Sequence, residues 1–197
     1  EALGVGDQPR KLELAISRTD IDAATRLLQG LPGPIIGLHA GAKWATKRWP
    51  ADKFAAVASR AMRERGASIV LLGSGDEAAL AASIAEQLDG GHVRNLAGGT
   101  SLKRLAAVLQ SVDLVLSNDS GPMHLAAELG TPVVGLFTCT DPVRSGPPGM
   151  QHQLVTSCVS CAGSYQKICP HRGAEHLACF RELSTERVFA AVTTLLD

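Results

Sequence analysis

A short polar run has the residue types and order of an anion-binding turn. It follows an apolar stretch, precedes a helical pattern and reads Asn118-Asp119-Ser120-Gly121-Pro122-Met123-His124. Ser120 would cap the helix, Gly121 would let a ligand approach the backbone, and Pro122 suits a first helical turn. The free N–H groups at such a helix start attract phosphate. We therefore predict a phosphate site here, with the Asp119 carboxylate accepting hydrogen bonds from adjacent sugar hydroxyls.

Two other interpretations of this run stay open. In the first, Asp119 and Ser120 only cap the helix and His124 only faces the sheet. In the second, the same three residues form a serine hydrolase triad. The second is disfavoured because Asn118 stands where the Gly-x-Ser-x-Gly turn needs glycine, and because a triad histidine comes from a distant loop.

A second loop concentrates positive charge ahead of the first long helix. Lys43, Lys47 and Arg48 stand within six positions. Lys47 or Arg48 could neutralise a diphosphate, although isolated lysines are more often solvated surface charges. Both tryptophans of the chain, Trp44 and Trp49, flank these cations. Amphipathic rings in such a loop often pack on a ligand or a lid, so this interpretation and a plain surface turn both stay open.

A third loop partly fits a dinucleotide fingerprint. Between a strand and a helix, the pattern G-x-G-x-x-A is met by Gly73-Ser74-Gly75-Asp76-Glu77-Ala78. An acidic residue about 20 positions later should hold the ribose, and residues 93–98 contain none. We therefore disfavour a nicotinamide site, although Glu77 could still meet a ribose from another direction.

The cysteines form a fourth group. Apart from Cys139, they crowd into one irregular segment, spaced Cys-x2-Cys-x7-Cys-x9-Cys, as Cys158, Cys161, Cys169 and Cys179. These four are weak candidates for a zinc or iron–sulfur site, with His171 and His176 as spare ligands. Because the spacing matches no standard metal motif, we expect no bound metal and instead free or oxidation-prone thiols.

The composition bounds what these loops can belong to. A chain of 197 residues predicts one domain, or a domain with a compact appendage. Hydrophobic residues make up 45% and charged residues 19%, which favours a folded core and excludes wholesale disorder. The 19 Lys and Arg balance the 19 Asp and Glu, so no overall positive field attracts nucleic acid and no nucleic-acid partner is expected. Any phosphate binding must be local.

Alternating strands and helices must hold the three polar loops. Strands are predicted at Ile35–Leu38, Ser68–Leu72, His92–Leu96, Asp113–Ser117 and Val133–Phe137. Helices are predicted at Ala51–Arg65, Glu77–Leu88, Ser101–Gln110 and Gly121–Leu129, with a leading helix at Asp20–Gln29 and a final one at Ser184–Leu196, capped by Ser184. This alternation predicts an α/β fold with a doubly wound parallel sheet, whose strand ends carry the loops.

Residues 34–148 resemble the carboxy-terminal domain of the glycosyltransferase family that contains the ADP-heptose:lipopolysaccharide heptosyltransferases, glycosyltransferase family 9. The strand-turn-helix run through Asp119–Ala126 carries most of the specificity. The other matching motifs are Gly41-Ala42-Lys43, Thr46-Lys47-Arg48-Trp49-Pro50, Leu72-Gly73-Ser74, Thr100-Ser101-Leu102, Gly135-Leu136-Phe137 and Thr140-Asp141-Pro142. The resemblance implies a Rossmann-like sheet that forms the carboxy-terminal half of a GT-B glycosyltransferase.

The resemblance also implies a site for a nucleotide-sugar donor. Lys47 would contact the donor phosphates and Asp119 the sugar. The diphosphate would be lined by Ser120, Gly121 and His124. The nucleoside would be bordered by Thr100, Leu102 and Glu77. No metal or other cofactor is implied, because a fixed cation and backbone N–H groups can balance the charge of the diphosphate.

The same resemblance divides the chain into three parts. Residues 1–33 would be a lead-in helix and linker from an amino-terminal domain, residues 34–150 the donor-binding domain, and residues 151–197 a Cys-rich loop and helix packing on that domain. A GT-B enzyme needs the amino-terminal domain for the acceptor and the catalytic base, and about 30 residues are too few to form it. The chain alone is therefore expected to fold without catalysing transfer.

The full-length protein would be an inverting glycosyltransferase. It would move heptose, or a related sugar, from an ADP-sugar to the lipopolysaccharide core in the cytoplasm, with peripheral association at the inner face of the bacterial inner membrane. The main alternative is a nucleotide-sugar-binding GT-B relative, epimerase-like or using another donor, without transfer to lipopolysaccharide. A further one is a scaffold domain that uses its Cys loop for metal or partner binding. The sequence leaves open the sugar, the acceptor, the base and the oligomeric state.

Overall fold

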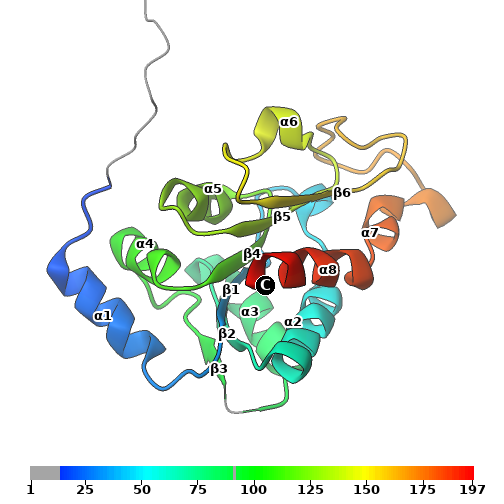
Figure 1. Ribbon diagram of the computed structural model, residues 1–197. Helices are drawn as coiled ribbons and strands as arrows, with labels where there is room; N and C mark the ends of the chain where they lie inside the picture. Colours follow the sequence, from blue (N-terminus) through cyan, green and yellow to red (C-terminus); the bar gives the residue numbers. More distant parts are fainter. Residues whose placement is uncertain (1–13, 91) are drawn as a thin grey trace, which may run out of the picture.

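The computed structural model describes residues 14–90 and 92–197, which build a single six-stranded sheet (Figure 1). Its strands are β1 (Ile35–His39), β2 (Ser68–Leu71), β3 (Val93–Asn95), β4 (Leu114–Asn118), β5 (Val133–Phe137) and β6 (Gln153–Thr156). They lie in the order β3-β2-β1-β4-β5-β6, and every neighbouring pair is parallel. The predicted doubly wound parallel sheet is therefore confirmed.

Helices cover both faces of the sheet, as Figure 1 shows. One face carries α1 (Arg18–Leu28), α4 (Leu102–Gln110) and α5 (Gly121–Glu128). The other carries α2 (Ala51–Arg65), α3 (Ala78–Ala85) and α8 (Thr185–Leu196). Two short helices, α6 (Pro142–Ser145) and α7 (Ala178–Glu182), lie in the carboxy-terminal connections. Within the described residues no helix has the length and apolar character needed to cross a membrane.

Local sequence explains where the main elements begin and end. In α2, Phe54, Ala58 and Ala61 recur every three or four residues and are all buried, which is the pattern of a helix laid on a sheet. The helix ends at Gly66 with φ of +63°, a left-handed conformation that glycine adopts without strain. Burying one side chain the size of Phe54 contributes about 1.5–3 kcal/mol. The helix boundaries predicted from these residues are confirmed.

The carboxy-terminal part differs from the prediction. The structure adds β6, which pairs with β5 at the edge of the sheet, together with α6 and α7. β6 has only four residues, all half-buried, so it lacks the apolar run that identifies a central strand. The leading helix begins two residues earlier than predicted, at Arg18. Residues 1–13 of the predicted lead-in segment lie outside the described residues.

The topology creates a crevice between β1 and β4. These strands are neighbours, with His39 paired to Ser117 in register, but the helices that follow them, α2 and α5, pack on opposite faces. In open α/β sheets ligands bind at such a switch point, outside the carboxyl ends of the strands. The loops after β1 and β4 therefore leave the sheet on either side of one opening.

Candidate functional site

An open cavity of about 440 Å³ lies at this switch point. Six of the eight predicted donor-site residues line it: Lys47, Glu77, Thr100, Leu102, Ser120 and Gly121. They come from four separate loops, at the ends of β1 and β2, before α4, and at the start of α5. The sheet thus brings together residues that stand up to about 74 positions apart in the sequence.

The two remaining predicted residues reach the cavity through Lys47. Its Nζ lies 3.3 Å from Asp119 Oδ2, and both side chains are largely buried, at 14% and 7% exposed. The second Asp119 oxygen, Oδ1, lies 3.8 Å from His124 Nε2. His124 is 43% exposed, so it does not face the sheet. The interpretation of Asp119 and His124 as mere cap and core residues is wrong.

Asp119 is held as a carboxylate. Burial opposes its ionisation, but the neighbouring His124 and Lys47 side chains outweigh burial and lower the pKa of Asp119 below its usual range. Lys47 therefore has an ionised partner, Asp119, in the wall of the cavity. A ligand phosphate that approaches Lys47 would share this cation with Asp119, and sugar hydroxyls could donate to the carboxylate.

Ser120 occupies the N-cap position of α5, but its side chain makes no cap hydrogen bond. The expectation that its hydroxyl caps the helix is therefore wrong. Its Oγ lies 3.1 Å from His39 Nδ1 and 3.1 Å from Ser117 Oγ. The start of α5 keeps its free N–H groups and carries Pro122 in its first turn, so the positive end of the helix faces the cavity. No Asp119–Ser120–His124 triad forms, because the hydroxyl faces His39.

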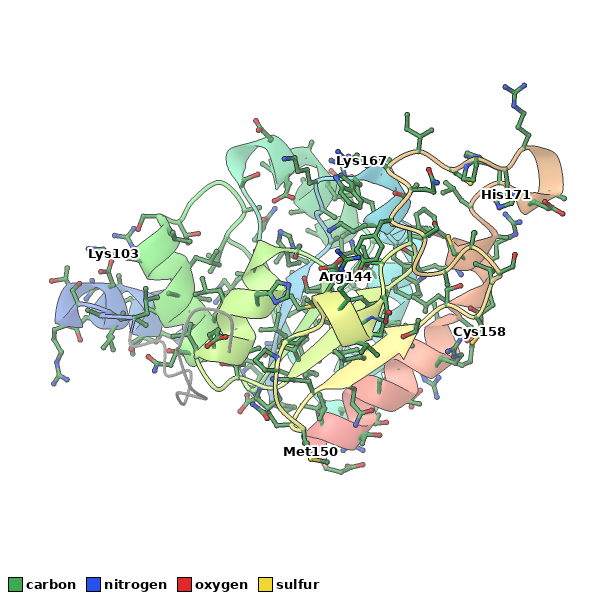
Figure 2. The ribbon with its side chains drawn as sticks, turned by 90° about the horizontal axis from the view of Figure 1, so that it is seen from above. Lys103, Arg144, Met150, Cys158, Lys167 and His171 are labelled. Carbon is green, nitrogen blue, oxygen red and sulfur yellow. The ribbon has the colours of Figure 1, made fainter. Side chains whose placement is uncertain are left out.

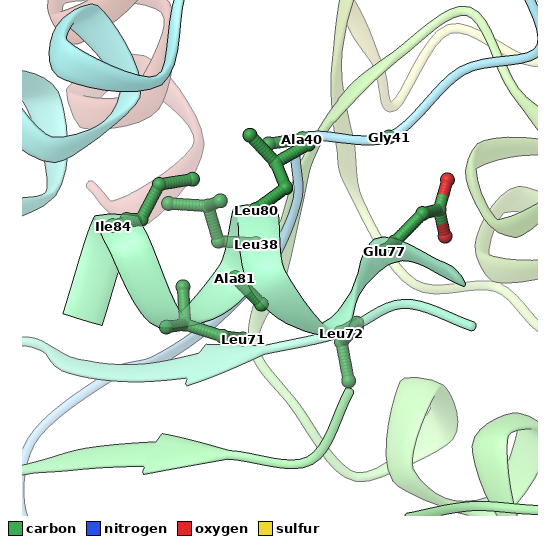
Figure 3. A pocket seen from close by; sticks show the side chains of 9 residues that line it. All are labelled: Leu38, Ala40, Gly41, Leu71, Leu72, Glu77, Leu80, Ala81 and Ile84. Carbon is green, nitrogen blue, oxygen red and sulfur yellow. The ribbon is translucent and has the colours of Figure 1, made fainter. Parts of the chain in front are cut away.

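The buried His39 joins Ser120 to Glu77. Its Nε2 lies 3.3 Å from Glu77 Oε2, on the side of the ring away from Ser120. This hydrogen bond from His39 is the largest cause that lowers the pKa of Glu77 to about 2. Figure 3 shows the Glu77 carboxylate beyond the apolar side chains that pack between α3 and the sheet, on the side of Gly41. A Cβ at Gly41 would lie 1.7 Å from Glu77 Oε1, so only glycine admits the carboxylate there.

The Gly73–Ala78 loop serves helix α3. The Ser74 backbone N–H donates to Glu77 Oε2 at 2.9 Å, and the Ser74 hydroxyl lies 3.2 Å from the same oxygen. Glu77 thus satisfies a free N–H at the start of the helical segment. This local role accounts for the G-x-G-x-x-A pattern without a dinucleotide.

The cationic loop after β1 divides its residues between core and cavity. Trp49 is 2% exposed, packs edge-on against Phe54 at 5.1 Å and donates from Nε1 to the Leu183 carbonyl. The expectation that Trp49 packs on a ligand or lid is therefore wrong. Arg48 donates from Nε to the Ala42 carbonyl at 2.6 Å, which closes the loop on itself. Lys47 is thus the better candidate for a diphosphate partner.

The far end of the cavity is apolar. Leu102 is 72% exposed, an unusual state for a leucine, and lines the cavity beside Thr100 and Leu105. Exposed apolar surface in a cavity with a few polar groups is typical of ligand sites. A flat base could lie on this surface while its phosphates reach the start of α5.

The cysteine segment is arranged differently from the prediction. Cys161, Cys169 and Cys179 do come together, but their fourth neighbour is Cys139; the four line a small cavity of about 20 Å³. Cys158, which the sequence grouped with them, is exposed. All five cysteines are free. In the described part of the chain no three His, Cys, Asp or Glu side chains form a group that could hold a metal ion.

This cysteine cavity touches the donor-side loop through one residue. Thr46 donates to the Gln166 carbonyl at 2.8 Å and accepts a hydrogen bond from Cys139 Sγ at 3.4 Å. Figure 2 shows Cys158, Lys167 and His171 along the connection between β6 and α7, on the opposite side of the molecule from Lys103 at the start of α4. The connection therefore braces the loop that carries Lys47.

Seven residues outside the predicted set also line the donor cavity: His39, Ala42, Lys43, Gly73, Ser74, Leu105 and Pro122. His39 is the last residue of β1 and stood at the start of the predicted loop. A polar residue that ends a buried parallel strand is a signal that could have identified it. Lys43 stood in the cationic loop and in a matching family motif, which already singled out that loop. Leu105 carries no comparable signal, because it stands among several other apolar residues of its helix.

Comparisons with known proteins agree with this geometry. Residues 1–174 match the profile of glycosyltransferase family 9 (heptosyltransferase). The chain is 35% identical over 150 residues to the lipopolysaccharide core heptosyltransferase OpsX of Haemophilus influenzae, covering 75% of this chain and 42% of that protein. The glycosyltransferase family 9 structure from Veillonella parvula aligns with a TM-score of 0.85 and 30% identity, over 99% of this chain and 56% of that one.

A ligand-bound structure has the same fold. E. coli heptosyltransferase WaaC with ADP aligns with a TM-score of 0.63 and 23% identity, over 87% of this chain and 48% of that chain. The chain spans about half the length of the curated relatives it matches. The match thus extends over the whole described sheet, while about half of each relative has no counterpart in the 197 residues.

Proposed function

The chain belongs to glycosyltransferase family 9, and we propose on this basis that it supplies the nucleotide-sugar donor site of an inverting heptosyltransferase. The observation that carries the proposal is the cavity at the β1–β4 switch point, which joins a cation, a free helix start and an exposed apolar surface. Those three features correspond in order to the diphosphate, its backbone ligands and the nucleoside.

Each end of the proposed donor has a partner. Lys47 and the N–H groups at the start of α5 would hold the diphosphate, and Leu102 with Thr100 would border the base. Glu77, held ionised, would accept hydrogen bonds from ribose hydroxyls. Asp119 and His124 would face the sugar beyond Lys47.

The same residues would assist departure of the leaving group. In the proposed reaction an acceptor hydroxyl attacks the anomeric carbon as the bond to the diphosphate oxygen breaks. Negative charge then grows on the diphosphate. Lys47 and the positive end of α5 would stabilise that charge without reorganising, and such fixed electrostatic stabilisation supplies much of the rate enhancement in many enzymes. The base that deprotonates the acceptor is proposed to come from the other half of a GT-B enzyme.

We further propose an ADP-sugar as donor and the lipopolysaccharide core as acceptor. The donor proposal is supported by the ligands of a protein with the same fold: structures of E. coli heptosyltransferase WaaC contain ADP or ADP-2-deoxy-2-fluoro heptose. With these substrates the protein would act in the cytoplasm, in peripheral contact with the inner face of the inner membrane. No metal or other cofactor is proposed to take part, because Lys47 and the start of α5 can balance the diphosphate.

Calorimetric titration of the purified chain with ADP, UDP and GDP tests the proposal. We expect ADP to bind most tightly, and ADP-heptose to compete with it. A preference for UDP would instead support the epimerase-like alternative. Absence of binding by all three nucleotides would contradict a donor site at this cavity.

A further inference from the structure

His39 is buried at the floor of the donor cavity and contacts both ends of the proposed donor site. One ring nitrogen, Nε2, lies 3.3 Å from the Glu77 carboxylate. The other, Nδ1, lies 3.1 Å from Ser120 Oγ and 3.4 Å from Ser117 Oγ. The side chain is 4% exposed, yet it lines the cavity. The ring therefore links the group expected near the ribose to the hydroxyl expected near the diphosphate.

The positions of the protons around the His39 ring follow from its hydrogen-bond partners. An ionised carboxylate can only accept, so His39 Nε2 must carry a proton that it donates to Glu77. The Ser117 hydroxyl donates to the Asn118 carbonyl at 2.8 Å, so its proton is already used. In the neutral ring Nδ1 is an acceptor, and the Ser120 hydroxyl is the donor that remains for it.

A phosphate at the start of α5 would compete for the Ser120 proton. Phosphate oxygens accept hydrogen bonds, so the Ser120 hydroxyl would turn from His39 to the ligand. Nδ1 would then face an oxygen lone pair with no proton between them, an unfavourable contact in a buried site. A proton on Nδ1 resolves the conflict, because Nδ1–H donates to Ser120 Oγ while the hydroxyl donates to the phosphate.

Nearby charges also favour a second proton on the His39 ring once a diphosphate is bound. Glu77 favours a protonated ring, whereas Lys43 and Lys47, which line the same cavity, oppose it. Asp119 neutralises part of the Lys47 charge at 3.3 Å. A bound diphosphate adds negative charge beside both lysines and removes their opposition. Ligand binding thus shifts the balance around His39 toward the doubly protonated ring.

We propose that His39 is a positioning residue of the donor site, which takes up a proton from solvent when the diphosphate binds and thereby orients the Ser120 hydroxyl toward the phosphate. The inference rests on the proposed function, since it requires a diphosphate at the start of α5. His39 itself contacts neither the sugar nor the reacting bond. It acts through Ser120 at one end and Glu77 at the other.

Proton uptake on ADP binding tests the inference. Calorimetric titrations at one pH, in buffers of different ionisation enthalpy, give the number of protons exchanged per ADP bound. For the unmodified chain we expect net uptake, and therefore an affinity that falls as the pH rises. His39→Asn can still reach Ser120 but cannot titrate. It should lower the uptake and flatten the pH profile, and it should weaken ADP binding about two- to tenfold.

Two further variants keep the test decisive. His92→Asn removes an exposed histidine ahead of β3 and should leave proton uptake unchanged. Ser120→Ala removes the hydroxyl that couples Nδ1 to the ligand and should lower the uptake even if His39→Asn unfolds. Tight ADP binding with no proton uptake, or uptake that both cavity variants retain, would overturn the inference while leaving the donor site intact. Failure of the unmodified chain to bind ADP would contradict the proposed function.

Discussion

Thr46 and Lys47 are neighbours in the 3-10 turn η1 (Ala45–Lys47), yet their side chains enter different cavities. Lys47 lines the donor cavity, where carboxylates are ionised and paired. Thr46 lines the cysteine cavity, where burial raises the pKa of Cys179 to about 11 and also raises that of Cys139. The Cys139 and Cys179 thiols are therefore protonated and uncharged at neutral pH.

The two cavities differ in charge, and this difference indicates that one binds a ligand while the other supports the loop between them. The donor cavity holds fixed charges that a ligand can rearrange, as a site for a charged molecule requires. The cysteine cavity is small, uncharged and joined to the donor loop by the hydrogen bonds of Thr46. We infer that changes in the donor cavity alter affinity, with a stability cost where they break a charge contact, whereas changes behind it alter stability alone. Variants on the two sides of this loop can break or confirm that separation.

The largest effect is expected for Trp49, which shares a loop with Lys47 but belongs to the core. Trp49→Ala should destabilise the fold by about 3–5 kcal/mol, because it leaves a cavity and removes the hydrogen bond to the Leu183 carbonyl. Chemical denaturation measures the loss. Trp49→Phe, which keeps most of the ring volume, should recover most of the stability. A stable Trp49→Ala chain with weakened ADP binding would assign this ring to the ligand instead.

Lys47→Ala should act mainly on the ligand. Loss of a charge-assisted hydrogen bond to the diphosphate should weaken ADP binding by about 1.5–3 kcal/mol. The thermal midpoint should also fall, because the buried Asp119 carboxylate loses its cation. Arg26→Ala is the matched control, because it removes an exposed cation from the last turn of α1. Titration calorimetry compares the two. An unchanged dissociation constant in Lys47→Ala would show that this lysine does not contact the diphosphate.

Cys179→Ser should show the opposite pattern. It places a more polar group in a buried site with little room for water, and it should cost about 1–3 kcal/mol of folding stability. ADP affinity measured below the unfolding transition should stay the same. The exposed Cys158, changed to Ser in the same way, should leave stability almost unaltered. Equal losses in both variants would show that burial does not distinguish these thiols.

Acid should weaken the Glu77 contribution in a defined range. The folded-state pKa of Glu77 is lowered from 4.5 to about 2, chiefly by the hydrogen bond with His39. The stabilisation is therefore fully present above about pH 4.5 and is lost as the pH falls toward about 2. The stability difference between the unmodified chain and Glu77→Gln should stay constant at neutral pH and narrow over that range. A difference that does not vary with pH would contradict the hydrogen bond from His39 to an ionised Glu77.

Metal removal should have the smallest effect. Protein purified under reducing conditions should contain no stoichiometric zinc or iron, and EDTA should leave its thermal midpoint unchanged, because free thiols need no ion to remain protonated. Elemental analysis and a thermal scan check both points. Stoichiometric metal would show that the cysteine cavity closes around an ion.

The sequence predicted the donor cavity better than the cysteine cavity for a physical reason. Gly121 and Pro122 act through local backbone geometry, which their order along the chain already expresses. The parallel strands then bring the loops together by a rule that holds for open α/β sheets. Membership of Cys139 in the cysteine cavity depends instead on how an irregular connection folds back, and spacing does not encode that.

His39 shows a second limit. Its role depends on partners at positions 77 and 120, which β1 meets only after the sheet has formed. Trp49 was misplaced for a similar reason. Its loop position suggested a ligand contact, but its ring fills the core beside Phe54. Residue type and loop position thus predict which loops meet, but not which side of a loop each side chain takes.

A crystal structure of the chain with ADP would test most directly whether the β1–β4 cavity is the donor site. We expect the diphosphate within hydrogen-bonding distance of Lys47 Nζ and of the backbone N–H groups at the start of α5, with the adenine against Leu102. ADP bound elsewhere on the chain, with the donor cavity empty, would contradict this assignment.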